Sequence, residues 1–286
     1  MTSRNSMAQE NATATPLGHS STLKPELFFI ARRRLLQMHY ESGVGHIGGN
    51  LSSLDLMLTL YHGVLRHEDA FVLSKGHSAG ALYIALWSKG VLSDEDLRLF
   101  HRDGTRLSGH PPVRGIPEIL FATGSLGHGL SLAAGLALAK KLKNESGRVF
   151  CLTSDGEWNE GSNWEALVFI KHHHLNNLTL IVDLNGLQGF GRTADIADLS
   201  PLTEKFGAFG LRVCQVDGHC ADALVEALHT YGPEPVAVVA KTVKGHGISF
   251  MEDRFEWHYL PLREEQYKEA ILELNTKCAK PSAEPF

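Results

Sequence analysis

The sequence lacks the features that mark secreted and membrane-spanning chains. Its four cysteines show no CxxC spacing, and two of them, Cys151 and Cys214, lie in apolar runs where cysteine usually behaves as a small hydrophobe in a reducing compartment. The first twenty residues are polar and contain no apolar centre of a signal peptide. The stretch 119–139 is interrupted by His128 and several glycines, so it is too polar to span a membrane. We therefore expect a cytoplasmic protein.

An excess of positive charge is also missing. The net charge is -5 over 286 residues, which gives no electrostatic reason to expect a nucleic-acid partner. Only Arg32, Arg33 and Arg34 are adjacent, and we expect them on the solvated face of a helix.

Two nucleotide-binding motifs and a zinc pattern are absent as well. No GxGxxG follows a predicted strand and no GxxxxGK[ST] occurs, so a nicotinamide or P-loop site has no support. The histidines at 172–174 are consecutive, and consecutive helix positions cannot face one ion together. We expect these three rings to face solvent or a subunit interface.

What the sequence does contain is an alternation of two kinds of apolar run. Runs that are apolar throughout predict strands at 70–74, 148–153, 178–184, 211–216 and 235–242. Runs with helical spacing predict helices at 23–40, 54–65, 80–89, 130–142, 164–174 and 221–231. This alternation is typical of an α/β protein whose parallel sheet is covered by helices on both faces. The polar residues 1–22 predict a flexible tail, and 23–286 predict one domain with a C-terminal helical extension.

Polar residues follow two of these strands, where ligands gather in parallel sheets. The segment LTSDGEWNEGSNW places Asp155 and Gly156 at one strand end, and Asn185 follows the next strand thirty positions later. Carboxylate and amide oxygens are hard ligands for Mg²⁺ or Ca²⁺, and the N–H of Gly156 can face an anion. Asp-Gly and Asn-Gly are also common turns, so only the pair at adjacent strand ends predicts a metal and diphosphate site.

The Asp-Gly pair, the thirty-residue gap and the asparagine resemble the thiamine-diphosphate signature. Six further motifs resemble those of transketolases, in the same order, within residues 23–275: ESGVGHIGG, LSKGH, SGHP, TGSLGHGLS, VDGH and KGHGISFMEDRFEWH. The resemblance implies the diphosphate-binding domain of the thiamine-diphosphate fold. It also implies thiamine diphosphate and Mg²⁺ or Ca²⁺ as cofactors.

The resemblance implies roles for individual residues. Asp155, Asn185 and the main-chain oxygen of Leu187 would ligate the metal ion, and His77 would donate to a diphosphate oxygen. The residues expected at the cofactor are His77, Gly124, Ser125, Leu126, Gly156, Glu157, Asn185, Lys244 and His258.

Four assignments concern catalysis. His46, His110 and His258 resemble substrate-facing histidines, because ketol transfer requires protons to be taken from and returned to substrate hydroxyls near neutral pH. Glu160 resembles the acid that links paired sites across a subunit interface. A lone histidine is more often structural, but each of these three stands in one of the ordered motifs.

The resemblance covers only the first domain of a transketolase. It implies the N-terminal subunit of a split enzyme, active with a partner subunit that supplies the pyrimidine-binding and C-terminal domains in an α2β2 heterotetramer. The activity would be transfer of a two-carbon ketol unit from a ketose or ketose phosphate to an aldose. No nucleic-acid or membrane partner is expected.

Several positions depart from the family pattern. Ser154 replaces a glycine, His128 stands where glutamine is usual, Gly189-Phe190 replaces a more polar pair, and Tyr259 replaces a glycine. The last three lie near the expected mouth of the site. They favour a specialised substrate, such as an unusual sugar phosphate, a sulfosugar or a secondary-metabolite precursor.

Two other functions stay open at this point. One is another thiamine-diphosphate enzyme subunit, either 2-oxo acid decarboxylating or similar to deoxyxylulose-phosphate synthase. The other is an inactive scaffold or regulatory protein, against which the retained aspartate, asparagine and histidines speak.

Overall fold

The computed structural model describes residues 23–279, and the expected tail at 1–22 lies outside them. Its centre is a five-stranded, fully parallel sheet with the strand order β1-β2-β3-β5-β4. The strands are β1 (Ala70–Leu73), β2 (Val149–Ser154), β3 (Leu178–Leu184), β4 (Arg212–Asp217) and β5 (Val236–Lys241). Each coincides with a predicted strand to within one residue, because buried parallel strands are recognisable as continuous apolar runs.

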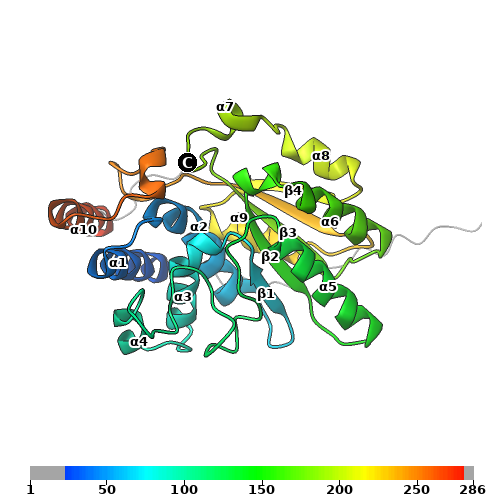
Figure 1. Cartoon of the computed structure of the whole chain (residues 1–286), viewed down its shortest axis with the longest axis horizontal. Helices are drawn as coiled ribbons and strands as arrows, with labels where there is room; N and C mark the ends of the chain where they lie inside the picture. Colours follow the sequence, from blue (N-terminus) through cyan, green and yellow to red (C-terminus); the bar gives the residue numbers. More distant parts are fainter. Residues whose placement is uncertain (1–22, 280–286) are drawn as a thin grey trace, which may run out of the picture.

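Helices cover both faces of this sheet (Figure 1). One face carries α1 (Pro25–Ser42), α2 (Ile47–Thr59), α3 (Ala79–Ser88), α9 (Ala221–His229) and α10 (Glu264–Ala279). The other face carries α5 (Gly129–Leu142), α6 (Gly161–His172) and α8 (Leu202–Ala208). The short helices α4 (Asp94–Arg98) and α7 (Thr193–Ala197) lie in connecting segments. The predicted fold class, a parallel α/β sheet covered on both faces, is confirmed.

The strand register brings the carboxyl ends of neighbouring strands to one edge. Ser154 at the end of β2 pairs with Asp183 of β3, and Leu184 pairs with Lys241 at the end of β5. The loops that follow these strands therefore meet at the same edge, where ligand sites of parallel sheets are found.

Helix α2 begins earlier than its apolar spacing predicts. The spacing predicts a helix over 54–65, whereas α2 starts at Ile47 and continues as one π-helical turn at Leu60–Val64. Gly48 is a poor helix former, but a Cβ at this position would lie 3.0 Å from the Trp257 side chain, so packing favours glycine here. The early start places His46 at the N-terminus of a buried helix.

The adjacent arginines of α1 do not form a solvated face. Arg33 is exposed, but Arg32 donates to Asp55 of α2 at 2.6 Å and Arg34 donates to Asp94 at 3.2 Å. The expectation is wrong for two of the three residues, because apolar spacing contains no information about acceptors on other helices.

Other expectations concern cysteines and the surface. Cys151 is buried in β2 and Cys214 is partly buried in β4, as predicted. His172 and His174 are exposed at the end of α6. Across residues 23–279, no helix is both long and apolar enough to cross a bilayer.

Candidate active site

Four histidines from separate segments converge at the carboxyl edge of the sheet, and we call them the histidine cluster: His46, His77, His110 and His258. The ring centre of His46 lies 5.6 Å from that of His77, 6.1 Å from that of His110 and 5.2 Å from that of His258. The rings of His77 and His258 are also 5.2 Å apart. All four positions come from the sequence motifs, and the fold brings them together.

Backbone strain and hydrogen bonds hold His46 in place. Its φ angle is +64°, in the left-handed region that residues other than glycine rarely occupy. Its N–H donates to the carbonyl oxygen of His258 at 3.0 Å. The buried amide of Asn50 donates to the carbonyl oxygens of His46 at 2.8 Å and His77 at 3.1 Å. Such strained and over-determined backbone is typical of functional sites.

The rings of the cluster are neutral at pH 7. Burial, together with the neighbouring His110 and Lys244, lowers the pKa of His46 to about 4. Burial and the Lys244 charge lower the pKa of His258 to about 3, and burial lowers the pKa of His77 well below its usual value. A neutral imidazole has one donor and one acceptor nitrogen, so these rings can both take and give a proton.

The three predicted metal ligands lie together on the loops after β2 and β3. The Asp155 carboxylate is buried and accepts from the N–H of Gly156 at 2.7 Å and from the N–H of Gly186 at 2.5 Å. Asn185 Oδ1 accepts from the N–H of Leu187 at 3.1 Å. One carboxylate, one amide oxygen and the nearby Leu187 carbonyl therefore form an oxygen set that is typical of Mg²⁺ and Ca²⁺ sites.

The ionisable groups of this site have perturbed pKa values. Burial raises the pKa of Asp155 to about 6. Lys244 Nζ lies 3.5 Å from the Leu187 carbonyl oxygen and 3.0 Å from Nδ1 of His258. Burial, with Lys75 nearby, lowers the pKa of Lys244 to about 8. Such perturbed groups mark candidate functional sites, because a bound cation and anion would compensate both of them.

Beneath these groups lies a buried ion pair that the sequence motifs do not reveal. Lys75, directly after β1, donates to Asp183 of β3, and both side chains are fully buried. Asp183 also accepts from Ser52 at 2.7 Å and from Thr242. The sequence signal is only a charged residue within or directly after each apolar run, and nothing local joins the two.

Two predicted acids do not face the cavity. The buried Glu157 carboxylate accepts from Ser74, from the N–H of Gly127 at 2.9 Å and from the N–H of Ser154 at 3.2 Å, so it braces the strand ends. Glu160 is exposed, and a Cβ at Gly127 would lie 2.6 Å from its own Cβ.

The loop 124–126 borders the site. A Cβ at Gly124 would lie 2.8 Å from the His110 ring, so the glycine permits this contact. Leu126 lines the cavity, whereas Ser125 is exposed.

The site encloses a cavity of about 170 Å³. Its inner wall includes Lys75, His77, Asp155, Asn185, Lys244 and His258. At its mouth, Phe190 is 83% exposed and Tyr259 is 56% exposed. The Tyr259 hydroxyl occupies the space that a Cβ at Gly189 would fill, and its ring centre lies 4.6 Å from that of His258. The departures at 189, 190 and 259 therefore lie together at the mouth.

Known proteins share this sequence over most of its length. The profile of the family described as "Transketolase, thiamine diphosphate binding domain" matches residues 29–283. One of the two subunits of an apulose-4-phosphate transketolase from Phocaeicola vulgatus is 35% identical over 87% of this chain and 92% of that protein. A 6-deoxy-6-sulfo-D-fructose transketolase subunit, SqwG, from Clostridium sp. strain MSTE9 is 36% identical over 87% of this chain and 95% of that protein.

Solved structures agree with the sequence relatives. The transketolase of Campylobacter jejuni matches with a TM-score of 0.80 and 26% identity, over 88% of this chain. The chain spans 43% of that transketolase, but nearly the whole of the two relatives named before it. It belongs to the transketolase family and is a transketolase subunit that carries the thiamine-diphosphate-binding domain.

Proposed function

We propose that the 170 Å³ cavity binds thiamine diphosphate with Mg²⁺ or Ca²⁺, and that the chain transfers a two-carbon ketol unit from a ketose to an aldose together with a second subunit. One observation carries this proposal. The predicted oxygen ligands and the histidine cluster, which come from distant parts of the sequence, converge at one edge of the sheet.

The oxygen set fits a hard cation. Each carboxylate oxygen of Asp155 accepts one backbone N–H, and an ionised carboxylate oxygen has a further lone pair for an ion. Asn185 Oδ1 and the Leu187 carbonyl are neutral oxygens of the kind that complete such a shell. A cation here would also favour the ionised form of Asp155, which burial opposes.

The rest of the inner wall fits a diphosphate. Lys244 and His77 present nitrogen donors, and Gly156 lines the cavity without a side chain. A Cβ at Gly156 would lie 2.7 Å from Gln188, so a larger residue would narrow this wall. When bound, thiamine diphosphate supplies the electron sink for the two-carbon unit.

The histidine cluster serves the substrate's protons. The neutral rings of His46, His110 and His258 accept a proton from a substrate hydroxyl and return it to the product. The same rings donate hydrogen bonds to an oxygen that gains negative charge. Their lowered pKa values keep the basic form populated at neutral pH.

The partner is a C-terminal transketolase subunit with the pyrimidine-binding and C-terminal domains, in an assembly of two copies of each chain. Two relatives of similar length are named as transketolase subunits, and the Campylobacter enzyme is more than twice as long as the matched part. The exposed Glu160, Phe190 and Tyr259 offer contacts to the second chain. Cytoplasmic location stays a prediction of the sequence.

The donor is a specialised ketose with an anionic group. The names of the relatives specify apulose-4-phosphate and 6-deoxy-6-sulfo-D-fructose, which carry a phosphate and a sulfonate. The aromatic residues at the mouth, Phe190 and Tyr259, support a substrate other than the ordinary sugar phosphates. No observation favours a decarboxylating or synthase-like subunit, or an inactive scaffold.

The test is reconstitution. The chain is purified with the C-terminal subunit from the same source, and ketol transfer is measured with Mg²⁺, thiamine diphosphate, phosphorylated and sulfonated ketoses, and a small aldose. Turnover by the complex, absent from an Asp155→Ala complex, supports the proposal. Cofactor binding without turnover on any donor would favour the scaffold.

A further inference from the structure

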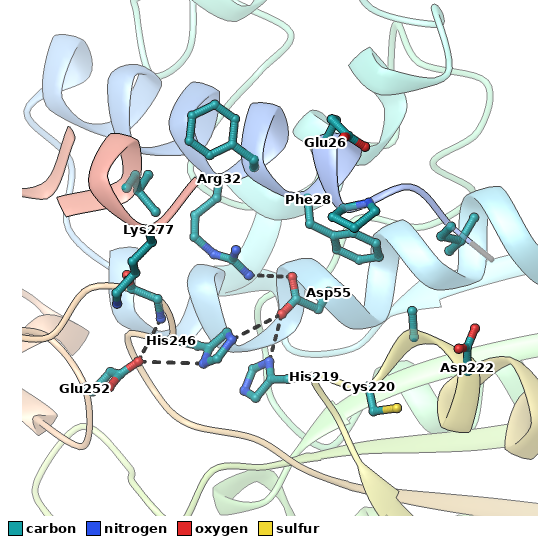
Figure 2. Close-up of a pocket in the computed structure, with 16 residues that line it drawn as sticks. Glu26, Phe28, Arg32, Asp55, His219, Cys220, Asp222, His246, Glu252 and Lys277 are labelled. Atoms are coloured by element: carbon teal, nitrogen blue, oxygen red, sulfur yellow. Dashed lines mark hydrogen bonds and ion pairs between the residues drawn. The ribbon is translucent and has the colours of Figure 1, made fainter. Parts of the chain in front are cut away.

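A second set of ionisable side chains lies outside the active-site cavity. Figure 2 shows Asp55 of α2 between Arg32 of α1, His219 after β4 and His246 after β5. Ligand atoms of Asp55, His219 and His246 all lie within 4.8 Å of one another, beside a separate cavity of about 760 Å³. Residues of these types at this spacing first suggest a metal centre.

The ring geometry argues against a metal ion. The rings of His219 and His246 are stacked, with centres 3.5 Å apart and planes 16° apart. An imidazole binds a metal ion in the plane of its ring, at about 2.0–2.1 Å from the nitrogen. Two nearly parallel planes at this separation share no such point, so one ring would have to rotate away.

Both nitrogens of His219 are already engaged. Nδ1 lies 2.8 Å from Asp55 Oδ2, and Nε2 accepts from the N–H of Val243 at 2.9 Å. A neutral ring has one protonated nitrogen, so the tautomer that satisfies both contacts carries its proton on Nδ1. A metal ion on Nδ1 would shift the proton to Nε2, where it would face the Val243 N–H.

The charge of Asp55 is also balanced. Arg32 donates to its other oxygen at 2.6 Å, and only 12% and 5% of the two side chains are exposed. Burial opposes ionisation, but the Arg32 charge and the hydrogen bond with His219 hold the pKa of Asp55 below its usual value. The carboxylate therefore stays ionised and fixes the His219 ring.

We propose that Arg32, Asp55 and His219 form a positioning chain for the active-site segment that begins at Val243, and do not form a metal centre. Strand β5 ends at Lys241, so the Val243 N–H has no strand partner, and a buried donor needs one. His219 provides it and thereby fixes the backbone next to Lys244.

The position of Lys244 depends on this backbone. Its Nζ contacts the Leu187 carbonyl oxygen at 3.5 Å and Nδ1 of His258 at 3.0 Å. Small displacements of such groups are costly in a preorganised site. The kinetic consequence rests on the proposed cofactor site, whereas the hydrogen-bond chain itself does not.

The first experiment reads the tautomer of His219 in the whole chain. Nitrogen-15 spectra of the histidine rings at pH 7, assigned with a His219→Gln variant, should show a protonated Nδ1 and an unprotonated Nε2. Titration with Zn²⁺ and with Mg²⁺ should leave the His219 and His246 signals unchanged. A proton on Nε2, or stoichiometric Zn²⁺ binding that shifts both rings, would overturn the proposal.

The second experiment separates the two hydrogen bonds of His219. In His219→Asn, the side-chain amide nitrogen replaces Nδ1, so the bond to Asp55 is kept and the bond to Val243 is lost. In His219→Gln, the amide oxygen reaches the place of Nε2, so the bond to Val243 is kept. We expect His219→Asn to weaken thiamine-diphosphate binding and to lower kcat/KM of the two-subunit complex about tenfold. His219→Gln should stay within about twofold of wild type.

The control is His67→Asn, which changes an exposed histidine before β1 and should change neither quantity. Equal losses in His219→Asn and His219→Gln would overturn the role of Val243. If the wild-type complex bound no thiamine diphosphate, the proposed function would fail, and the tautomer and the Zn²⁺ titration would still decide this proposal.

Discussion

Asp155 is a carboxyl group whose surroundings oppose its ionisation. Burial raises its pKa to about 6, so the free carboxylate is lost as the pH falls through this value. Because a cation binds the ionised form, metal affinity should be full above pH 7 and should fall below pH 6.

Replacing Asp155 by asparagine should abolish metal-dependent cofactor binding, since the shape is kept and the charge is removed. Calorimetric titration with Mg²⁺ and thiamine diphosphate at about pH 5.5 and 7.5 measures both effects. Asp195→Asn, on an exposed side chain of α7, is the control. Unchanged affinity in Asp155→Asn would remove the metal assignment.

His110 and His77 should differ in what their loss affects. His110 lies at the rim beside Gly124, so His110→Ala should lower kcat by about 10²-fold with cofactor affinity nearly unchanged. His77 lines the inner wall, so His77→Ala should mainly weaken cofactor binding. Steady-state kinetics and cofactor titration of both variants separate the roles, and the reverse pattern would move His110 into the cofactor shell.

Single residues could be predicted where a motif surrounds them. His46, His77 and His110 each follow a glycine in such a motif, and the fold brings them together. Lys75 and Asp183 could not be paired from the sequence, because 108 residues separate them and neither has a local partner. Side-chain pairs of this kind depend on the strand order, which no local pattern contains.

Between elements, the Lys75–Asp183 pair joins the end of β1 to β3 in the core. Removing one partner leaves a buried charge uncompensated, so Lys75→Met should lower the free energy of unfolding by about 3–5 kcal/mol. Lys143→Met, which removes an exposed pair with Glu145, should cost less than about 1 kcal/mol. Urea denaturation of both variants measures the difference, and equal small losses would contradict this role.

The contact between Gly189 and Tyr259 joins two loops at the mouth. A Cβ at Gly189 would overlap the Tyr259 hydroxyl, so Gly189→Ala should displace the ring and raise KM for the donor about tenfold. Tyr259→Gly should relieve the overlap, so the double variant should be less impaired than the sum of both changes. A double-mutant cycle on KM, with cofactor affinity as the control, tests this; additive effects would mean that the two loops act independently.

Among the elements, strands were more predictable than helix α2. The buried strands are apolar on both faces and appear as continuous runs. The first turns of α2 contain Gly48 and Gly49, which local propensity disfavours, and close packing against Trp257 outweighs that preference.

For the whole molecule, we expect no ketol transfer by the purified chain alone and full activity with its partner. The reason is that the pyrimidine-binding domain belongs to the expected second subunit. Native mass spectrometry should show two copies of each chain. Robust turnover by the single chain, or a complex with one copy of each, would contradict the respective prediction.

The neutral histidine cluster has a thermodynamic consequence. A diphosphate anion placed beside these rings stabilises their protonated form, so its binding is linked to proton uptake. A cation at Asp155 has the opposite linkage, because below about pH 6 it displaces a proton. When both arrive together, the two proton exchanges partly cancel, and the assembled cofactor site is less sensitive to pH than either half.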